Sequence, residues 1–161
     1  LFEVSTTNTD IKNKKVIIHA VGNGDCYENH KLEFAVLAKR DPNYHVAGFN
    51  FRGTLKSTGF AKSEDDWIDD AVAVVEHYHA QGVPYKNILL NGQSLGGALV
   101  TMAAAKIYRK NQEQAKQKGL DPKTAESVKL INVRSFATLT DEIIHSILGR
   151  VGSALLAGIL Y

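Results

Sequence analysis

The chain has 161 residues, of which 44% are hydrophobic and 22% are charged. These proportions are typical of a single globular domain with an adequate hydrophobic core. The formal net charge of +2 is too small to indicate a nucleic-acid-binding protein. Cys26 is the only cysteine, so an intrachain disulfide is excluded and no oxidising compartment is indicated. The sequence begins at Leu1 without a signal-peptide pattern, and we expect it to be a piece of a longer chain.

Apolar runs and helical patterns alternate along the chain. Short runs rich in β-branched residues predict buried strands, whereas apolar residues spaced three and four apart predict helices. In chain order, the predicted elements are a strand at 15–21, a helix at 27–40, a strand at 44–51, a helix at 63–81, a strand at 88–91, a helix from 95 to about 110, a strand at 128–136 and a helical pattern from 140 onward. In the first of these helices, we expect Leu32, Phe34, Val36 and Leu37 to share the apolar side. The alternation predicts an α/β fold, with a parallel, doubly wound sheet and helices on both faces.

The segment around Ser94 is an apolar strand that breaks at Gly92-Gln93-Ser94-Leu95-Gly96 and then becomes helical. In that context the Gly-x-Ser-x-Gly pattern predicts a nucleophile elbow, a tight turn that presents the serine hydroxyl at the sheet edge. Glycine is needed at 92 and 96 because side chains there would collide with the neighbouring strand or helix. The backbone N–H of Leu95, at the positive end of the helix, would stabilise an oxyanion when Ser94 attacks a carbonyl. The alternative is a chance pattern in a glycine-rich turn.

The loops that follow the predicted strands are expected to form one pocket. In parallel sheets, ligands bind at the carboxyl ends of the strands. Residues 22–25 and 52–59 follow two of these strand ends, and Ser94 follows a third. We therefore expect all three segments to meet at one edge of the sheet.

Three stretches in this order resemble the α/β-hydrolase fold. They are His19-Ala20-Val21-Gly22-Asn23-Gly24, Phe49-Asn50-Phe51-Arg52-Gly53 and Gly92-Gln93-Ser94-Leu95-Gly96-Gly97. The resemblance spans about residues 15–140 and is closest to serine hydrolases with a Gly-Asn-rich oxyanion loop and an Asn-x-Arg-Gly-x-x-x-Ser-x-Gly loop, which the sequence up to Gly59 fits. A weaker resemblance links the chain to the SidB group of lipase-like effectors that bacteria deliver through a type IV secretion system. It implies secretion into a host cell, whereas a cytoplasmic location is the alternative.

The resemblance to α/β hydrolases implies roles for individual residues. Ser94 would be the nucleophile, and the backbone N–H groups of Leu95 and Asn23 would form the oxyanion hole. A different alignment of the oxyanion loop moves the second donor to Val21. The substrate would be contacted by Gly22, Arg52, Gly53 and Gln93.

The remaining triad members are not evident in the sequence. The family's triad runs Ser, acid, His along the chain, and Asp141 lies where some members carry their acid. His145, four residues later, would share a helix face with Asp141, but the family's histidine comes from a loop beyond two further strands. A helix cap for Asp141 and a surface or core position for His145 are the favoured roles, and catalysis by the pair is the alternative. The triad acid and base are then expected beyond residue 161.

No metal or other cofactor is expected. The spacings of the histidines and of Cys26 do not match a zinc site. Five of the six histidines also precede Ser94, whereas the triad histidine of the family follows the nucleophile. Ordinary packing explains these side chains.

The segment at 143–161 is apolar but is interrupted by charge, and it barely reaches the length of a membrane span. We expect a core helix whose partner strands lie beyond 161, or a lid that covers the pocket and contacts a lipid surface. Uncovered apolar surface on this segment and on the last strand also predicts that the chain either pairs with another copy of itself or folds this segment back over the pocket.

The leading hypothesis is a serine hydrolase that cleaves a carboxylic ester or thioester with an acyl chain. Residues 1–161 would be one domain, with a core at about 15–140 and a cap, lid or core helix at 141–161. Alone, these residues are expected to hydrolyse activated esters very slowly, because an oxyanion hole without a general base leaves Ser94 a weak nucleophile. The alternative is a hydrolase-like binding or scaffold domain of a secreted effector. Residue types do not choose among phospholipase, acylglycerol lipase, thioesterase and peptidase.

Overall fold

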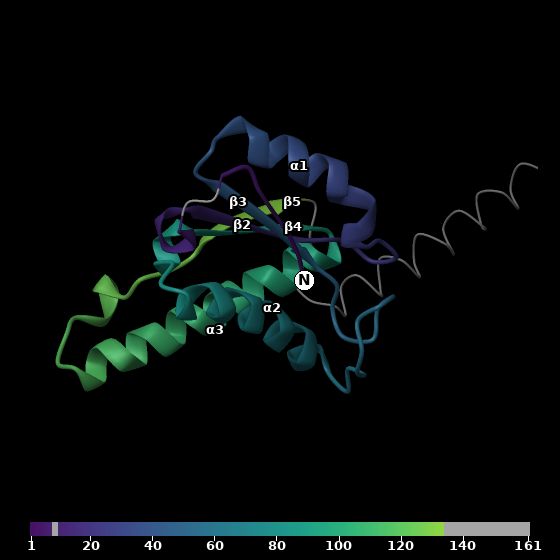
Figure 1. The fold of residues 1–161 in the computed structure, drawn as a ribbon. Coiled ribbons are helices and arrows are strands. Elements are labelled where there is room, and N and C mark those ends of the chain that lie inside the picture. The colour runs from purple at the N-terminus through teal and green to yellow at the C-terminus, as the bar shows by residue number, and fades with distance from the viewer. Residues whose placement is uncertain (8–9, 134–161) are drawn as a thin grey trace, which may run out of the picture.

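A computed structural model describes residues 1–7 and 10–133, and the structural statements below refer to them. Their centre is a five-stranded sheet of strand order β1-β3-β2-β4-β5 (Figure 1). The strands are β1 (Phe2–Ser5), β2 (Lys15–Ala20), β3 (Tyr44–Phe49), β4 (Ile88–Gln93) and β5 (Lys129–Val133).

The parallel sheet that the alternating pattern predicts is confirmed. Strands β3, β2, β4 and β5 are parallel, and β4 lies between β2 and β5. Strand β1 was not predicted. It is a four-residue edge strand that pairs antiparallel with β3, and so short a run at an edge carries little periodic signal. Residues 134–136 of the last predicted strand lie outside the described residues.

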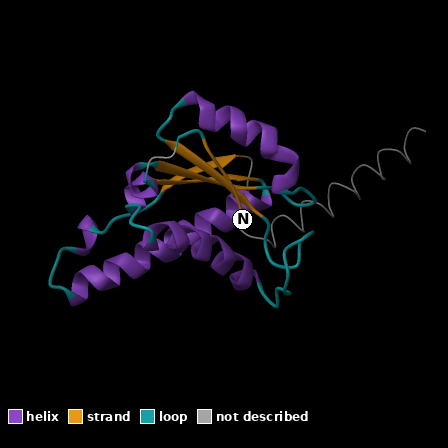
Figure 2. Cartoon of the chain, in the orientation of Figure 1, coloured by secondary structure: helices purple, strands orange, loops and turns teal. Residues whose placement is uncertain are grey.

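Helices cover both faces of the sheet. The α-helices are α1 (Lys31–Arg40), α2 (Glu64–Ala80) and α3 (Leu95–Gln117), and the 3-10 helices are η1 (Ile11–Asn13), η2 (Tyr27–His30), η3 (Tyr85–Asn87) and η4 (Pro122–Thr124). Helix α1 lies on one face, and α2 and α3 lie side by side on the other (Figure 2). Helix α3 continues beyond residue 110 as far as Gln117. None of the helices within the described residues is both long and apolar enough to cross a membrane.

The sequence predicted the apolar face of α1 only in part: Phe34 is buried and Leu37 packs against the same cluster, as predicted, but Leu32 and Val36 are exposed. Phe34 and Ala38 are buried, whereas Leu32 is 79% exposed and Val36 49% exposed. Residues two apart point in nearly opposite directions on a helix, so these pairs cannot both face the sheet. Phe34 packs inward because β3 has Gly48 beneath it: a Cβ at Gly48 would lie 2.9 Å from Phe34 Cζ. The first turn of the predicted helix is the 3-10 helix η2.

Alternation along β2 divides the core between the two faces. Val16, Ile18 and Ala20 belong to the larger cluster, which includes residues of α2 and α3. Ile17 belongs to the smaller cluster, with Phe34. All these side chains are buried, so the carboxyl ends of the strands are fixed in place by packing on both sides.

Candidate active site

Ser94 lies on a turn of one residue between β4 and α3. Strand β4 ends at Gln93 and α3 begins at Leu95, and Ser94 takes φ 50° and ψ −122°. Leu55 is the other non-glycine residue with a positive φ in the described chain. A non-glycine residue in this region is strained, and such strain is concentrated at functional sites. The strand, turn and helix therefore have the geometry that the sequence predicts around Ser94.

Gly92 and Gly96 are required by close approach of the main chain. A Cβ at Gly92 would lie 2.6 Å from Gly97 Cα and 2.6 Å from Val100 Cγ2. A Cβ at Gly96 would lie 2.7 Å from the carbonyl carbon of Ala20. The first turn of α3 thus rests directly on β4 and on the end of β2.

The backbone amides expected to act with Ser94 are those of Leu95 and Asn23, and both residues line the same cavity. The N–H of Leu95, at the first position of α3, has no acceptor within the helix. Gly22 brings the loop after β2 against Ser94, since a Cβ there would lie 3.3 Å from Ser94 Cβ and 4.0 Å from its Oγ. Asn23 follows in an exposed turn closed by a 3.3 Å hydrogen bond from Asp25 N to Gly22 O. Within the described residues, no backbone carbonyl accepts from the Asn23 amide.

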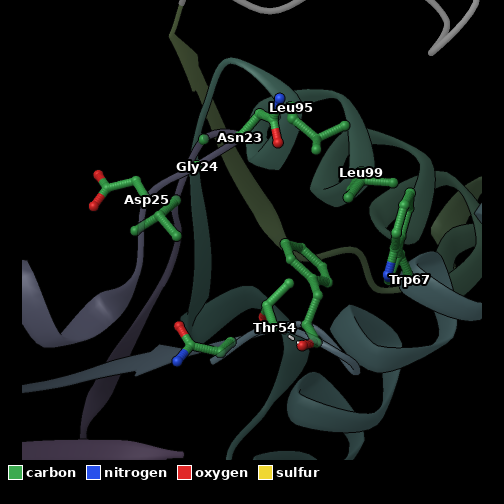
Figure 3. A pocket seen from close by; sticks show the side chains of 11 residues that line it. Asn23, Gly24, Asp25, Thr54, Trp67, Leu95 and Leu99 are labelled. Atoms are coloured by element: carbon green, nitrogen blue, oxygen red, sulfur yellow. Dashed lines mark hydrogen bonds between the residues drawn. The ribbon is translucent and has the colours of Figure 1, made fainter. Parts of the chain in front are cut away.

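A cavity of about 100 Å³ opens beside these amides. Its lining combines apolar side chains with polar groups: Val21, Gly22, Asn23, Gly24, Asp25, Asn50, Phe51, Thr54, Trp67, Leu95 and Leu99. Figure 3 shows Asn23 beside Leu95, with Leu99 and Trp67 farther along the same wall. Ser94 is not itself in this lining, but Gly22 and Leu95 on either side of it are. Val21 also lines the cavity, so the geometry does not choose between Asn23 and Val21 as the residue that supplies the second amide.

The four residues expected to contact substrate lie in different surroundings. Gly22 lines the cavity beside Ser94. Gln93 is exposed at the end of β4, and Gly53 takes φ 76° in the loop after β3. Arg52 contacts a second hollow, of about 450 Å³, together with Ser57 to Phe60 and Asp70. The structure therefore brings Ser94, Leu95, Gly22 and Asn23 together and places Arg52 elsewhere.

Arg52 is engaged by two carboxylates of α2. Its Nε and Nη2 donate to Asp70 Oδ1 at 2.8 and 2.6 Å, and its Nη1 donates to Asp66 Oδ1 at 3.1 Å. Its backbone N–H donates to Asp70 Oδ2 at 2.7 Å. The hydrogen bonds to Asp70 raise the pKa of Arg52 further above its ordinary value. Arg52 therefore joins the loop after β3 to the start of α2.

Asp25, at the rim of the cavity, belongs to a histidine cluster that sequence reasoning did not identify. Its Oδ2 lies 2.7 Å from His30 Nε2, a contact that lowers the pKa of Asp25 to about 2 and raises that of His30. The His19 ring lies 5.3 Å from the His30 ring. Burial lowers the pKa of His19, which is 8% exposed. The Asp25 carboxylate is therefore engaged by His30.

Trp67, Thr54 and Leu99 also line the cavity without having been predicted. Trp67 is the single tryptophan of the sequence, but a lone aromatic residue on a helix is as typical of a core as of a site. Asp141, His145 and the apolar segment at 143–161 lie outside the described residues. Among the described residues, no group of three or more His, Cys, Asp or Glu is arranged to hold a metal ion.

Comparison with known proteins adds a family and a fold. The family model described as "Serine aminopeptidase, S33" matches residues 12–120. No curated protein matches the chain.

Three solved structures are among those similar to the chain. An α/β serine hydrolase without a lid from Xanthomonas campestris is 28% identical over 63% of this chain and 48% of its own, with a TM-score of 0.47. A thermophilic esterase from Thermogutta terrifontis is 18% identical over 66% and 38%, with a TM-score of 0.48. A carboxylesterase of Nitrososphaera gargenis is 17% identical over 73% and 49%, with a TM-score of 0.53, and shows the fold. The chain spans less than half the length of each.

Proposed function

Because the chain belongs to the serine aminopeptidase S33 family of α/β hydrolases, we propose that it supplies the nucleophile and the oxyanion hole of a serine hydrolase. The proposed substrate is a carboxylic ester or thioester, and Ser94 is the nucleophile. The conformation of Ser94 carries the proposal: φ 50° on a turn of one residue, under a helix start that only glycine at 96 permits. Such an outlier supports a functional reading because a fold that did not need it would relax it.

In the proposed reaction, Ser94 Oγ attacks the carbonyl carbon of the substrate. As the new C–O bond forms, negative charge moves to the carbonyl oxygen, and the amides of Leu95 and Asn23 donate hydrogen bonds to it. Each donor contributes about 3 kcal/mol to transition-state stabilisation. The alcohol or thiol then leaves with a proton, and water releases the acyl group from Ser94.

The proton of Ser94 must pass to a general base. We propose that this base lies outside the described residues, since the histidine cluster behind Asp25 packs on the α1 face of the sheet, against Phe34. His145 with Asp141 is the pair available within residues 1–161. A base from beyond residue 161 is the alternative that the family's order of triad residues favours.

The test is a fluorophosphonate probe applied to the full-length protein. We expect labelling that disappears in Ser94→Ala, whereas Ser57→Ala, which changes a serine in the neighbouring hollow, should label as the wild type does. A hydrolase-like binding or scaffold domain of a secreted effector, the second candidate, would not be labelled. An aminoacyl p-nitroanilide, tested alongside p-nitrophenyl esters, distinguishes a peptidase from an esterase.

A further inference from the structure

Trp67 lines the cavity beside Ser94 and stands in the α2 sequence between Asp66 and Asp70, the two ion-pair partners of Arg52. We propose that Trp67 determines substrate specificity by closing the acyl pocket, and that Arg52 is a positioning residue that holds this wall in place. The substrate class that fits is an ester or thioester of a short acyl group, of about four carbons. This inference rests on the proposed function of Ser94.

The size of the cavity sets the chain length. An apolar protein cavity of about 150 Å³ binds benzene, which has six carbons, so the cavity of about 100 Å³ accommodates about four. Its apolar lining, which includes Phe51, Leu95 and Leu99, suits a hydrocarbon chain. The chain would enter past Gly22 and Leu95, the two lining residues that flank Ser94.

Trp67 is the one residue of α2 in this lining. Most of the remaining lining comes from the loops after β2 and β3 and from the first turns of α3, which close packing fixes. Trp67 projects from the first turns of α2 and packs against the main core cluster. Its indole N–H donates to Arg52 O at 3.4 Å, a long hydrogen bond that would not hold the ring by itself.

The guanidinium of Arg52 supplies the firmer constraint. It bridges Asp66 and Asp70, which lie immediately before and three residues after Trp67 on α2. Asp66 in turn accepts hydrogen bonds from the backbone N–H groups of Lys62 and Ser63 at 2.7 and 3.1 Å. The wall that carries Trp67 and the loop that carries Thr54 are therefore tied to one cation. The fork of the arginine side chain matters here, because lysine offers a point charge without the paired donors.

The same contacts give Arg52 a role other than substrate binding. Three of the five N–H groups that a guanidinium offers are directed at Asp66 and Asp70. Arg52 also lines the neighbouring hollow rather than the cavity beside Ser94. We therefore expect Arg52 to affect the reaction by holding the acyl pocket in shape.

The test is the acyl-length profile of the full-length protein, measured as kcat/KM for p-nitrophenyl esters with acyl chains of two, four, eight and twelve carbons. Each methylene that finds room should raise kcat/KM about four-fold, so the wild type should rise from two to four carbons and then fall at least ten-fold at eight. Trp67→Ala should reverse the preference between four and eight carbons, so that the ratio of kcat/KM for the two esters comes to favour the longer one. Arg52→Lys should shift the profile in the same direction but less far, mainly through KM for the longer esters.

A matched control removes a different ion pair of α2, the one that joins Asp69 to Lys106 of α3. Lys106→Gln removes the ion pair of Lys106 with Asp69, an α2 residue outside the cavity lining, and should leave the profile unchanged. Trp67→Phe serves if the alanine variant does not fold, and should extend the accepted chain by one or two carbons.

Failure of this inference can be distinguished from failure of the proposed function. Hydrolysis that depends on Ser94 but proceeds equally well with four and twelve carbons, or a profile that Trp67→Ala and Trp67→Phe leave unmoved, would overturn the inference and spare the proposed function. A shift with Trp67→Ala but none with Arg52→Lys would overturn the role of Arg52. Absence of any Ser94-dependent labelling would overturn both.

Discussion

Replacing Gly96 by alanine would test whether contact between the start of α3 and the end of β2 positions the Leu95 amide. The new Cβ would lie 2.7 Å from the carbonyl carbon of Ala20. Carbon atoms in favourable contact are about 3.5 Å apart or more, so the first turn of α3 must withdraw by about 0.8 Å. Both sides of this contact are main chain, and no side chain can rotate to relieve it.

The change should affect the reaction more than the fold. Overpacking of this kind costs about 1–3 kcal/mol, and alanine in place of glycine in a helix returns about 1 kcal/mol. The net loss of about 0–2 kcal/mol lowers Tm by roughly 0–8 °C in a domain of this size. A shift of about 1 Å in a catalytic group, by contrast, can lower the rate about 100-fold, because the Leu95 N–H would no longer meet the oxyanion.

The assay pairs thermal unfolding with fluorophosphonate labelling and ester hydrolysis in the full-length protein. Ala105→Gly, on the exposed part of α3, is the control: it removes one methyl group and about 1 kcal/mol of helix stability but should leave the labelling rate unchanged. The reasoning would be refuted if Gly96→Ala reacted at the wild-type rate, or if Ala105→Gly lost as much activity.

Three further predictions concern stability and assembly. Gly48→Ala should lower the free energy of unfolding by about 1–3 kcal/mol in urea titrations without changing substrate preference, because its Cβ would press on the ring of Phe34; unchanged stability would show that α1 can shift freely. His30→Gln should be most destabilising near pH 5 and least near pH 9. The pKa of His30 is raised and that of Asp25 is lowered from 3.8 to about 2, so the pair stabilises the fold fully between about pH 4 and about pH 6.5, and this stabilisation is lost as pH rises through the pKa of His30. An equal loss of stability at both pH values would contradict this. Residues 1–161 are predicted to self-associate in light scattering coupled to size exclusion, because Leu130, Ile131 and Val133 of β5 are between 40% and 46% exposed; a strict monomer would contradict that prediction.

Local patterns in the sequence were enough for the four parallel strands and the helices between them, although not for the edge strand β1. The β-branched runs at β2 and β4 and the helical spacing of α2 repeat within a few residues, and such repeats fix element type because they place side chains on one face. The glycines around Ser94 indicated the turn as a local pattern, although a Cβ at Gly92 would meet Gly97 and Val100 of the adjoining helix, whereas one at Gly96 would meet Ala20 of the distant strand β2. The lengths of the connections between strands, and the right-handedness of such crossover connections, then imply that the strands are parallel.

Contacts between distant segments were decided by the tertiary structure alone. The face of α1 depended on Gly48 of β3, which leaves room for the ring of Phe34, and the sequence of α1 itself favoured no such choice. Likewise, Arg52 was expected at the substrate but is bound by Asp66 and Asp70, and nothing in the spacing of these residues shows that a loop and a helix will meet there.

The sequence by itself thus determined the order of strands and helices and the turn at Ser94, because these follow from backbone geometry and short-range periodicity. The tertiary structure decided which side chains surround that turn. The cavity is shaped by Trp67 of α2, Leu99 of α3 and the loops after β2 and β3, segments whose mutual distances are set by packing across the sheet. A pattern in one segment carries no information about that packing, since partner choice depends on the volume left by all the others.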